Sequence, residues 1–399
     1  MQVASLQDTR RYDDWLAELR ELVRYRELRV IERRRGQRVL IDGRAAILFC
    51  SNDYLNLATD PRLADAAAQA AREYGAGAAA SRYISGNHPL YARLETATAA
   101  MKDCAASLVF STGYMANLGV LTGLFRRGDV IFSDAENHAS IIDGCRLSRA
   151  EIKIFPHGDY AALETLLRET PVTGVRGIVS ESLFSMSGTC ANLEKLAALK
   201  QRYHSLLIID DAHAVGALGA AGGGMTVAAR LADQIDVVIG TYSKAFGGFG
   251  GFAAGNARWM EILRNAARSL IYTTALPPAV LAMNIRALEI TRLEWQNTQP
   301  QLRRNAELVR AALAGEAWCQ PQGTHYIVTL PAGSDRAAVA LSRDLLDAGF
   351  FVGAIRPPTV PEGQAALRIS LSSGHTREDI DGLCAALRRL APTRITAHA

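Results

Sequence analysis

Several features that would exclude an ordinary globular enzyme are missing from this sequence. No stretch approaches the roughly 20 apolar residues that a membrane helix needs. The first residues, "MQVASLQDTRRYDDWLAEL", mix both charge signs without an apolar block, so we expect no secretory signal there. The six cysteines lie far apart and form no C-x-x-C pair, which argues against a disulfide framework and fits a reducing compartment. We therefore expect a cytoplasmic protein without a membrane span.

Concentrated charge and metal motifs are also missing. The net charge of +4 is too small to indicate a nucleic-acid partner, which needs a concentrated basic face. The eight histidines include no H-E-x-x-H motif, and we expect no metal. One basic run, residues 24–38, is interpreted as a solvated helix end, with attraction of an anionic substrate as the alternative.

The chain is long enough for a large core, because it has 399 residues of which 49% are apolar. Through its middle, short apolar runs alternate with segments of helical spacing. The runs expected to be buried strands are residues 107–110, 130–133, 152–155, 177–182, 206–211, 236–241 and 251–255. Strands that alternate with helices predict an α/β fold with a mostly parallel sheet covered on both faces.

The texture of the sequence changes near Pro278. Long amphipathic stretches (279–315 and 335–348) then flank two short strand candidates, "HYIVTL" and "ALRISL". We therefore expect an N-terminal arm (1–50) with one helix near 11–23 and a short hairpin, a large domain (51–285), and a smaller C-terminal α+β domain (286–399).

Polar residues follow four of the predicted strands, at the edge where open α/β sheets bind ligands. The stretch "FSTGYMANLG" (110–119) places a hydroxyl- and glycine-containing turn before a helix, and helix N-termini bind phosphate. Taken alone, such a turn is more often only a cap. In "SDAENHASIIDG" (133–144), His138 begins a helix, and in "GTYSKAFGGFGGFAAG" (240–255), Lys244 precedes two glycine pairs.

The fourth stretch, "IIDDAHAVG" (208–216), ends an apolar strand with two aspartates and a histidine. Successive side chains on a strand point to opposite faces, so Asp210 and Asp211 cannot both face one ligand. The residues alone leave open which of the two does so.

Together, these four features indicate pyridoxal phosphate (PLP). The lysine can form a Schiff base with the cofactor aldehyde once its pKa falls. An aspartate can keep the pyridine nitrogen protonated, so that the ring accepts electrons. Hydroxyl and backbone N–H groups can hold the phosphate, and glycines let the backbone pass close to the cofactor.

At this point the sequence resembles the α-oxoamine synthases, a family of fold-type-I PLP enzymes, over nearly the whole chain. The matching stretches are "FCSNDYLNLATDPRL", "GAGAAASRYISGNHPLYARLE", "FSTGYMANLGVL", "NHASIIDGCRLS", "IIDDAHAVGALG", "GTYSKAFGG", "IYTTALPP" and "RPPTVPEGQAALRISLSSGHT". The resemblance implies a large PLP domain with a seven-stranded sheet and a smaller C-terminal domain.

The resemblance also assigns roles to residues. Lys244 matches the Schiff-base lysine, Asp210 the partner of the pyridine nitrogen, His213 the donor to the phenolic oxygen, and His138 the histidine stacked on the ring. The other expected cofactor contacts are Ser111, Thr112, Gly113, Tyr114, Ser185, Thr241, Ser243 and, from the neighbouring subunit of a homodimer, Thr274. The expected substrate contacts are Asn52, Arg368 for the amino-acid carboxylate, and Arg26 for a carboxylate at the far end of the acyl chain.

The implied reaction is the decarboxylative condensation of alanine, glycine or serine with an acyl thioester, carried by coenzyme A or acyl carrier protein, to an α-amino ketone. Asn56, Ser187 and Ala214 depart from the commonest family pattern and leave the acyl chain open. An aminotransferase or lyase of the same fold remains the alternative, whereas a non-catalytic relative is disfavoured because Lys244 is present.

Overall fold

The computed structural model describes residues 6–318 and 320–395. Contacts between Cα atoms divide the chain into two compact units. The large unit holds Asn52–Ser185 and Thr189–Leu302, and the described residues of the small unit lie within Met1–Ser51, Met186–Gly188 and Arg303–Ala399. One long helix, α11 (Pro278–Leu313), runs through the division.

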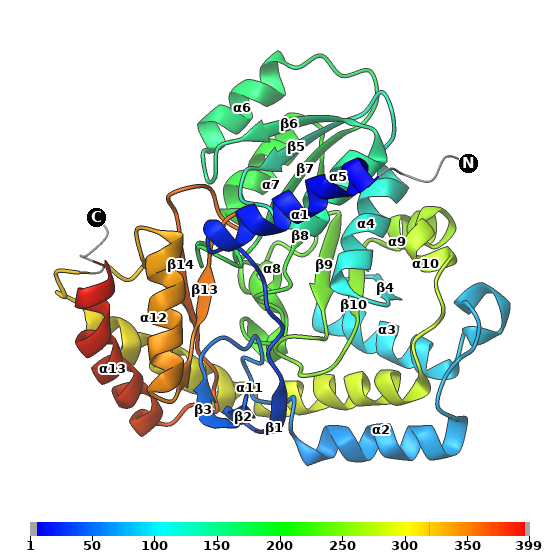
Figure 1. The fold of residues 1–399 in the computed structure, drawn as a ribbon. Helices are drawn as coiled ribbons and strands as arrows, with labels where there is room; N and C mark the ends of the chain where they lie inside the picture. Colours follow the sequence, from blue (N-terminus) through cyan, green and yellow to red (C-terminus); the bar gives the residue numbers. More distant parts are fainter. Residues whose placement is uncertain (1–5, 319, 396–399) are drawn as a thin grey trace. The chain divides into compact units, whose positions relative to one another are not determined.

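The large unit is built on a seven-stranded sheet (Figure 1). In sheet order the strands are β4 (Ala106–Phe110), β10 (Gly251–Gly255), β9 (Val237–Thr241), β8 (Leu206–Asp210), β7 (Arg176–Glu181), β5 (Val130–Asp134) and β6 (Glu151–Phe155). Only β10 runs antiparallel to its neighbours, β4 and β9. The carboxyl ends of β8, β7, β5 and β9 therefore meet at one edge, where loops lead into helices.

Helices cover both faces of this sheet. The helices and helical turns of the large unit are α2 (Pro61–Tyr74), η1 (Arg82–Gly86), α3 (Pro89–Met101), α4 (Gly113–Leu124), α5 (Ala139–Ser148), α6 (Tyr160–Glu169), α7 (Leu193–Arg202), η2 (Ala220–Gly222), α8 (Gly224–Ala228), α9 (Ala257–Ala266) and α10 (Arg268–Ile271). On β8, Ile208 packs with α4 and α5, whereas Leu207 and Ile209 pack with α6 and α7. The apolar residues of one strand thus serve two cores, as the period of two requires.

The small unit contains two further sheets. A four-stranded sheet has the order β1 (Ile31–Arg35), β2 (Arg38–Ile41), β3 (Arg44–Leu48), β12 (Phe350–Phe351), and a three-stranded antiparallel sheet has the order β11 (Ile327–Pro331), β14 (Ala366–Ser370), β13 (Gly353–Ile355). Its remaining helices are α1 (Leu6–Glu21), α12 (Asp335–Asp347) and α13 (Arg377–Ile395). N-terminal and C-terminal segments share this unit because β3 pairs in parallel with β12.

The predicted fold class is confirmed, and the expected strands match the observed ones to within a residue or two at each end. The boundary expected after residue 285 falls inside α11, whereas the contacts change at Leu302. The interpretation of residues 24–38 as a helix end is wrong, because α1 ends at Glu21 and the basic run continues into β1 and β2. Of the described helices, none is both long enough and apolar enough to cross a membrane.

Candidate active site

The expected site residues of the large unit gather at the carboxyl edge of the sheet. Asp210 ends β8, Glu181 ends β7, and the two residues are register partners in the parallel ladder. His138 is the N-cap of α5, after β5, and Lys244 follows β9. Electrostatic interactions connect His138 with both Asp210 and Lys244, so residues from three separate loops and strand ends act on one another.

Asp210 is buried and is held by neutral donors. Its Oδ2 accepts a hydrogen bond of 2.7 Å from Asn117 Nδ2 on α4, and its Oδ1 accepts one of 2.9 Å from the backbone N–H of Ala212. The same Asn117 nitrogen lies 2.9 Å from Ser140 Oγ, which lies 2.7 Å from His138 Nδ1. Since neither donor to Asp210 is charged, its negative charge is left for a cationic ligand group.

Asp211 has a different environment, as the alternation along β8 requires. Its Oδ2 accepts a hydrogen bond of 2.6 Å from Lys102 Nζ, and both side chains are completely buried. Lys102 also donates to Thr226 Oγ1 at 2.8 Å, and Ser182 donates to Asp211 Oδ1. Asp211 is therefore neutralised inside the protein, which leaves Asp210 as the aspartate available to a ligand.

Glu181 is a buried carboxyl group that the sequence analysis did not single out. It is 2% exposed, and its Oε1 has no hydrogen-bond partner among the described residues. Burial raises its pKa well above the ordinary value and the charge of Asp210 acts in the same direction, while Lys244 and the backbone N–H groups of His138 and Ser185 lower it. The apolar run that precedes Glu181 in "GIVSES" was its only signal in the sequence.

An anion can be held where β4 leads into α4. Thr112 caps the helix by accepting from Met115 N at 3.0 Å, and the first turn of a helix presents further N–H groups without intrahelical partners. A Cβ on Gly251 would come within 2.6 Å of Gly113 N, so the backbones of β10 and this turn approach closely. Thr241 Oγ1 lies 2.6 Å from Ser243 Oγ, which places two hydroxyl groups beside the same turn.

The loop after β9 is compact and depends on glycine. Gly247 has φ +64°, and a Cβ there would come within 2.3 Å of Ala58 N. Its N–H donates to Lys244 O at 2.9 Å, which closes the turn carrying the lysine. The glycine pairs thus shape a turn that an alanine could not fit.

His213 is oriented by a tyrosine that the sequence analysis also missed. The Tyr54 hydroxyl lies 2.7 Å from His213 Nδ1, and it donates to Asn52 Oδ1 at 3.1 Å. Tyr54 is fully buried. Asn52 and His213, both expected site residues, are therefore connected through one buried hydroxyl group.

The remaining expected cofactor contacts lie nearby in the large unit or on its surface. Ser111 Oγ lies 3.5 Å from Thr273 Oγ1, Tyr114 donates to Asp143, and Ser185 is buried. Thr274 is exposed, and its backbone forms an isolated bridge with Ser81. Within one chain it is therefore Thr273, not Thr274, that contacts the expected phosphate turn.

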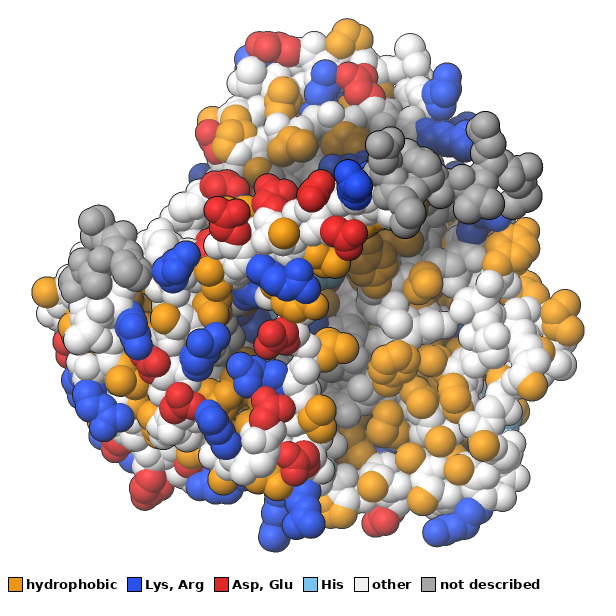
Figure 2. All heavy atoms as spheres, in the orientation of Figure 1, with side chains coloured by type: hydrophobic (Ala, Val, Ile, Leu, Met, Phe, Trp, Pro, Cys, Tyr) orange, Lys and Arg blue, Asp and Glu red, His pale blue; other side chains and the backbone are white. Residues whose placement is uncertain are grey.

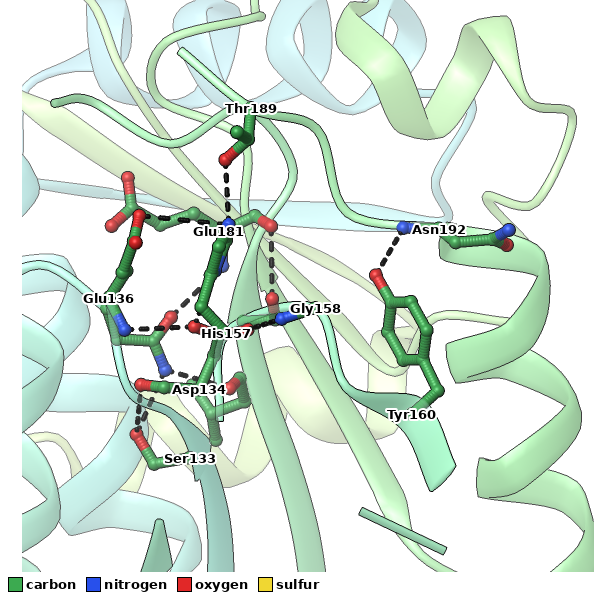
Figure 3. A network of polar contacts seen from close by, with 12 residues as sticks. Ser133, Asp134, Glu136, His157, Gly158, Tyr160, Glu181, Thr189 and Asn192 are labelled. Atoms are coloured by element: carbon green, nitrogen blue, oxygen red, sulfur yellow. Dashed lines mark hydrogen bonds and ion pairs between the residues drawn. The ribbon is translucent and has the colours of Figure 1, made fainter. Parts of the chain in front are cut away.

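A second polar network lies beside β5 and β7 (Figure 3). Asp134 accepts from His157 Nδ1 at 2.9 Å and from the backbone N–H groups of Glu136 and Gly158. His157 Nε2 lies 2.8 Å from Thr189 Oγ1, and Asp134 raises the pKa of this histidine. The network joins the loops after β5, β6 and β7, and so supports the chain segments that carry His138 and Ser185.

The two expected substrate arginines belong to the small unit. Arg368 lies on β14, is buried, and donates to Ser370 Oγ at 2.7 Å. Arg26 donates to Thr359 Oγ1 at 3.3 Å, and no acidic partner is found for it among the described residues. Its neighbour Arg24 is instead paired with Asp335 and Glu362. Arg26 therefore retains a charge that an anion can use.

The chemistry of the large-unit residues fits PLP. An amine, a buried carboxylate, two histidines and a helix N-terminus are the groups that such a cofactor requires. Among the described residues no group of three or more His, Cys, Asp or Glu could hold a metal.

Comparison with known proteins agrees with this site. A model of the aminotransferase class I and II family matches residues 44–387. The 8-amino-7-oxononanoate synthase of Geobacter sulfurreducens is 45% identical over 377 residues, which cover 94% of this chain and 96% of that protein.

Solved structures are similar as well. A serine palmitoyltransferase from S. paucimobilis with bound PLP–myriocin aldimine gives a TM-score of 0.92 at 29% identity, covering 96% of this chain and 98% of that one. The 8-amino-7-oxononanoate synthase of Francisella tularensis gives a TM-score of 0.74 at 29% identity, covering 86% and 97%. The chain therefore belongs to the aminotransferase class I and II family, and within it to the relatives of the α-oxoamine synthases.

Proposed function

We propose that this chain is a PLP-dependent acyltransferase that condenses a small amino acid with an acyl thioester, and that it acts as an 8-amino-7-oxononanoate synthase. The observation that carries the proposal is the mutual interaction of Asp210, His138 and Lys244 at the carboxyl edge of the sheet. The identity of 45% to such a synthase over most of both chains supports the specific activity.

Each residue has a defined task in this reaction. PLP, when bound, supplies an aldehyde for the Lys244 amine and a ring that withdraws electrons from the substrate. Asp210 holds a proton on the ring nitrogen, and the first turn of α4 with Thr241 and Ser243 binds the phosphate. The Lys244 amine removes the proton from the substrate Cα, and His138 covers the ring.

Arg368 and Arg26 are proposed to bind the two substrate carboxylates. Arg368 pairs with the amino-acid carboxylate, for which a bidentate guanidinium is suited. Arg26 pairs with the carboxylate at the far end of a pimeloyl chain, a role supported by its lack of an acidic partner among the described residues.

The test of this function is thiol release by purified protein across a grid of amino acids and acyl-CoA thioesters. We expect a visible absorption band that Lys244→Ala abolishes together with turnover, and the highest rate with alanine and pimeloyl-CoA. Arg26→Ala should reduce turnover with pimeloyl-CoA far more than with an uncharged acyl-CoA, whereas Arg29→Ala, which breaks only a surface pair with Asp42, should not.

Preference for an uncharged fatty acyl-CoA would instead favour an activity like that of the serine palmitoyltransferases, whose structures give TM-scores of 0.92. A colourless, active protein would contradict the whole proposal.

The proposed unit is a cytoplasmic homodimer. Hydrophobic side chains remain exposed on the large unit and Figure 2 shows orange groups gathered over α3 and α10; the exposed residues include Tyr83, Ile84, Phe249 and Tyr272. A second copy covering such a surface would bring Thr274 to the partner's phosphate turn.

Mixing two inactive or weakened chains tests the shared site. In a mixed dimer of Lys244→Ala and Thr274→Ala chains, one site combines an intact Lys244 with an intact Thr274 of the other chain. Activity above that of Thr274→Ala alone is expected. A monomeric mass with full activity would contradict the dimer.

A further inference from the structure

A chain of hydrogen bonds connects Asp210 with His138 through two side chains to which no role has been assigned. Asn117 Nδ2 lies 2.7 Å from Asp210 Oδ2 and 2.9 Å from Ser140 Oγ. Ser140 Oγ lies 2.7 Å from His138 Nδ1. Asn117 and Ser140 are 2% and 1% exposed, so water does not compete for these contacts. The chain joins the end of β8 to α4 and then to the start of α5.

The donors in this chain can be assigned from chemistry. A carboxylate has no proton to donate, so Asp210 must face the NH₂ group of Asn117 and not its oxygen. Asn117 uses that group for both Asp210 and Ser140, and its Oδ1 is buried without a hydrogen-bond partner. An unpaired buried oxygen is costly. The amide is therefore held in this orientation by Asp210.

The state of His138 follows from the same contacts. The backbone N–H of Ser140 lies 3.2 Å from His138 Nδ1 and can only donate, so Nδ1 accepts. The neutral ring then carries its proton on Nε2. Burial lowers the pKa of His138 and Lys244 acts in the same direction, against the charge of Asp210. Other groups facing His138 are the Tyr114 ring, at 6.5 Å, and Glu181, which accepts its backbone N–H.

We propose that Asn117 and Ser140 are positioning residues: Asn117 orients the Asp210 carboxylate, and Ser140 holds His138 as a neutral imidazole protonated on Nε2. This inference rests on the proposed function, in which Asp210 and His138 both face PLP. A neutral imidazole adds no positive charge next to a protonated ring nitrogen. It also leaves Nε2–H as the only donor of the imidazole for a substrate.

The arm toward His138 is tested with Ser140→Ala and, as a matched control on the same helix, Ser148→Ala. Ser148 is also buried, but its hydroxyl bonds only to Cys145 O. NMR of ¹⁵N-histidine in the PLP-bound protein reports the tautomer and the pKa of His138. We expect the Nε2–H form in the parent protein, and a proton affinity about tenfold higher in Ser140→Ala, because the neutral ring loses a donor. Ser148→Ala should leave both unchanged.

The arm toward Asp210 is tested with Asn117→Ala, with Thr122→Ala on the same helix as control because its hydroxyl bonds only to Leu118 O. Asn117→Ala should weaken PLP binding about tenfold and shift the pH at which the visible band titrates, as expected for the loss of a charge-assisted bond. Thr122→Ala should change neither. The double variant Asn117→Ala/Ser140→Ala should be less than additive in the His138 titration.

Two results would overturn the proposal: a parent His138 that is protonated on Nδ1 at pH 7, or identical titrations of Ser140→Ala and Ser148→Ala. A parent protein that binds no PLP would end the proposed function instead. The His138 tautomer in the cofactor-free protein would still judge the hydrogen-bond chain.

Discussion

Asp210 and Asp211 are neighbours in the sequence, yet the protein gives them opposite environments. Asp210 is held by the neutral donors Asn117 and Ala212, whereas Asp211 is paired with the buried Lys102. The pleat sends successive side chains to opposite sides, so a pair of aspartates at a strand end supplies one charge to a site and one to the interior. Neutral donors keep a carboxylate charge available, whereas a buried lysine cancels it.

The largest difference between the two should appear in activity. Asp210→Asn should lower turnover by about two to three orders of magnitude, the loss typical of one essential electrostatic group. Its free energy of unfolding should stay within about 1 kcal/mol, since the hydrogen-bonding side chain remains. Turnover and urea unfolding of the same preparation check this. A normal rate would mean that Asp210 does not serve the cofactor.

The interior side of the comparison is tested by Lys102→Met. Removing one partner of a buried pair leaves a charge without compensation, and should cost about 3–5 kcal/mol of unfolding free energy. Lys153→Met is the matched control, because the Lys153–Glu151 pair lies at the surface and should cost less than about 1 kcal/mol. Equal losses in the two variants would contradict the role of Lys102. Adding Asp211→Asn to Lys102→Met should recover part of the stability.

Glu181 extends the comparison to a carboxyl group without a cation in hydrogen-bond contact. Its folded-state pKa is raised by burial, so the folded chain binds more protons than the unfolded chain and stability falls as the pH rises above about 4.5. The slope is about 1.4 kcal/mol per pH unit until the folded-state pKa is passed. Glu181→Gln removes this dependence and should be more stable than the parent at pH 8 but not at pH 4. Parallel stability curves against pH would show that Glu181 is ionised in the fold.

The smallest effect is expected at Ser182, which donates to Asp211 Oδ1 and is fully buried. Ser182→Ala should cost about 1–2 kcal/mol, the value of one hydrogen bond to a charged group. The visible cofactor band should keep its position and its pH dependence, because Asp211 is not part of the ligand site. A shifted band would show that the two aspartates are coupled.

Much of the fold was accessible from the sequence because apolar runs and glycines report local geometry. The run 251–255 was predicted as a strand and is β10, and the helix expected from Pro278 begins there. Asn56 stands where the family usually has glycine, and its φ of +59° shows the reason, since this region favours glycine and tolerates asparagine. The roles carried onto Lys244, Asp210 and His138 by resemblance remain predictions for the experiments above.

The residues that were missed share a different property. Asn117, Ser140, Glu181, Tyr54 and Lys102 lie in helices, strands and loops whose patterns are satisfied without them, so nothing local distinguishes them. Only packing of α4, α5 and the loop before Lys102 against the sheet brings them to Asp210 and its neighbours.

By itself, the sequence determined the alternation of strands and helices, the lysine and the aspartate pair at strand ends, and the family, because these depend on residue type and spacing along the chain. The tertiary structure alone decided which neutral and charged groups surround each aspartate and which nitrogen of His138 can carry a proton. The physical reason is that hydrogen-bond partners and burial depend on distances in space. Asn117 and Asp210 are 93 positions apart in the chain and 2.7 Å apart in the fold.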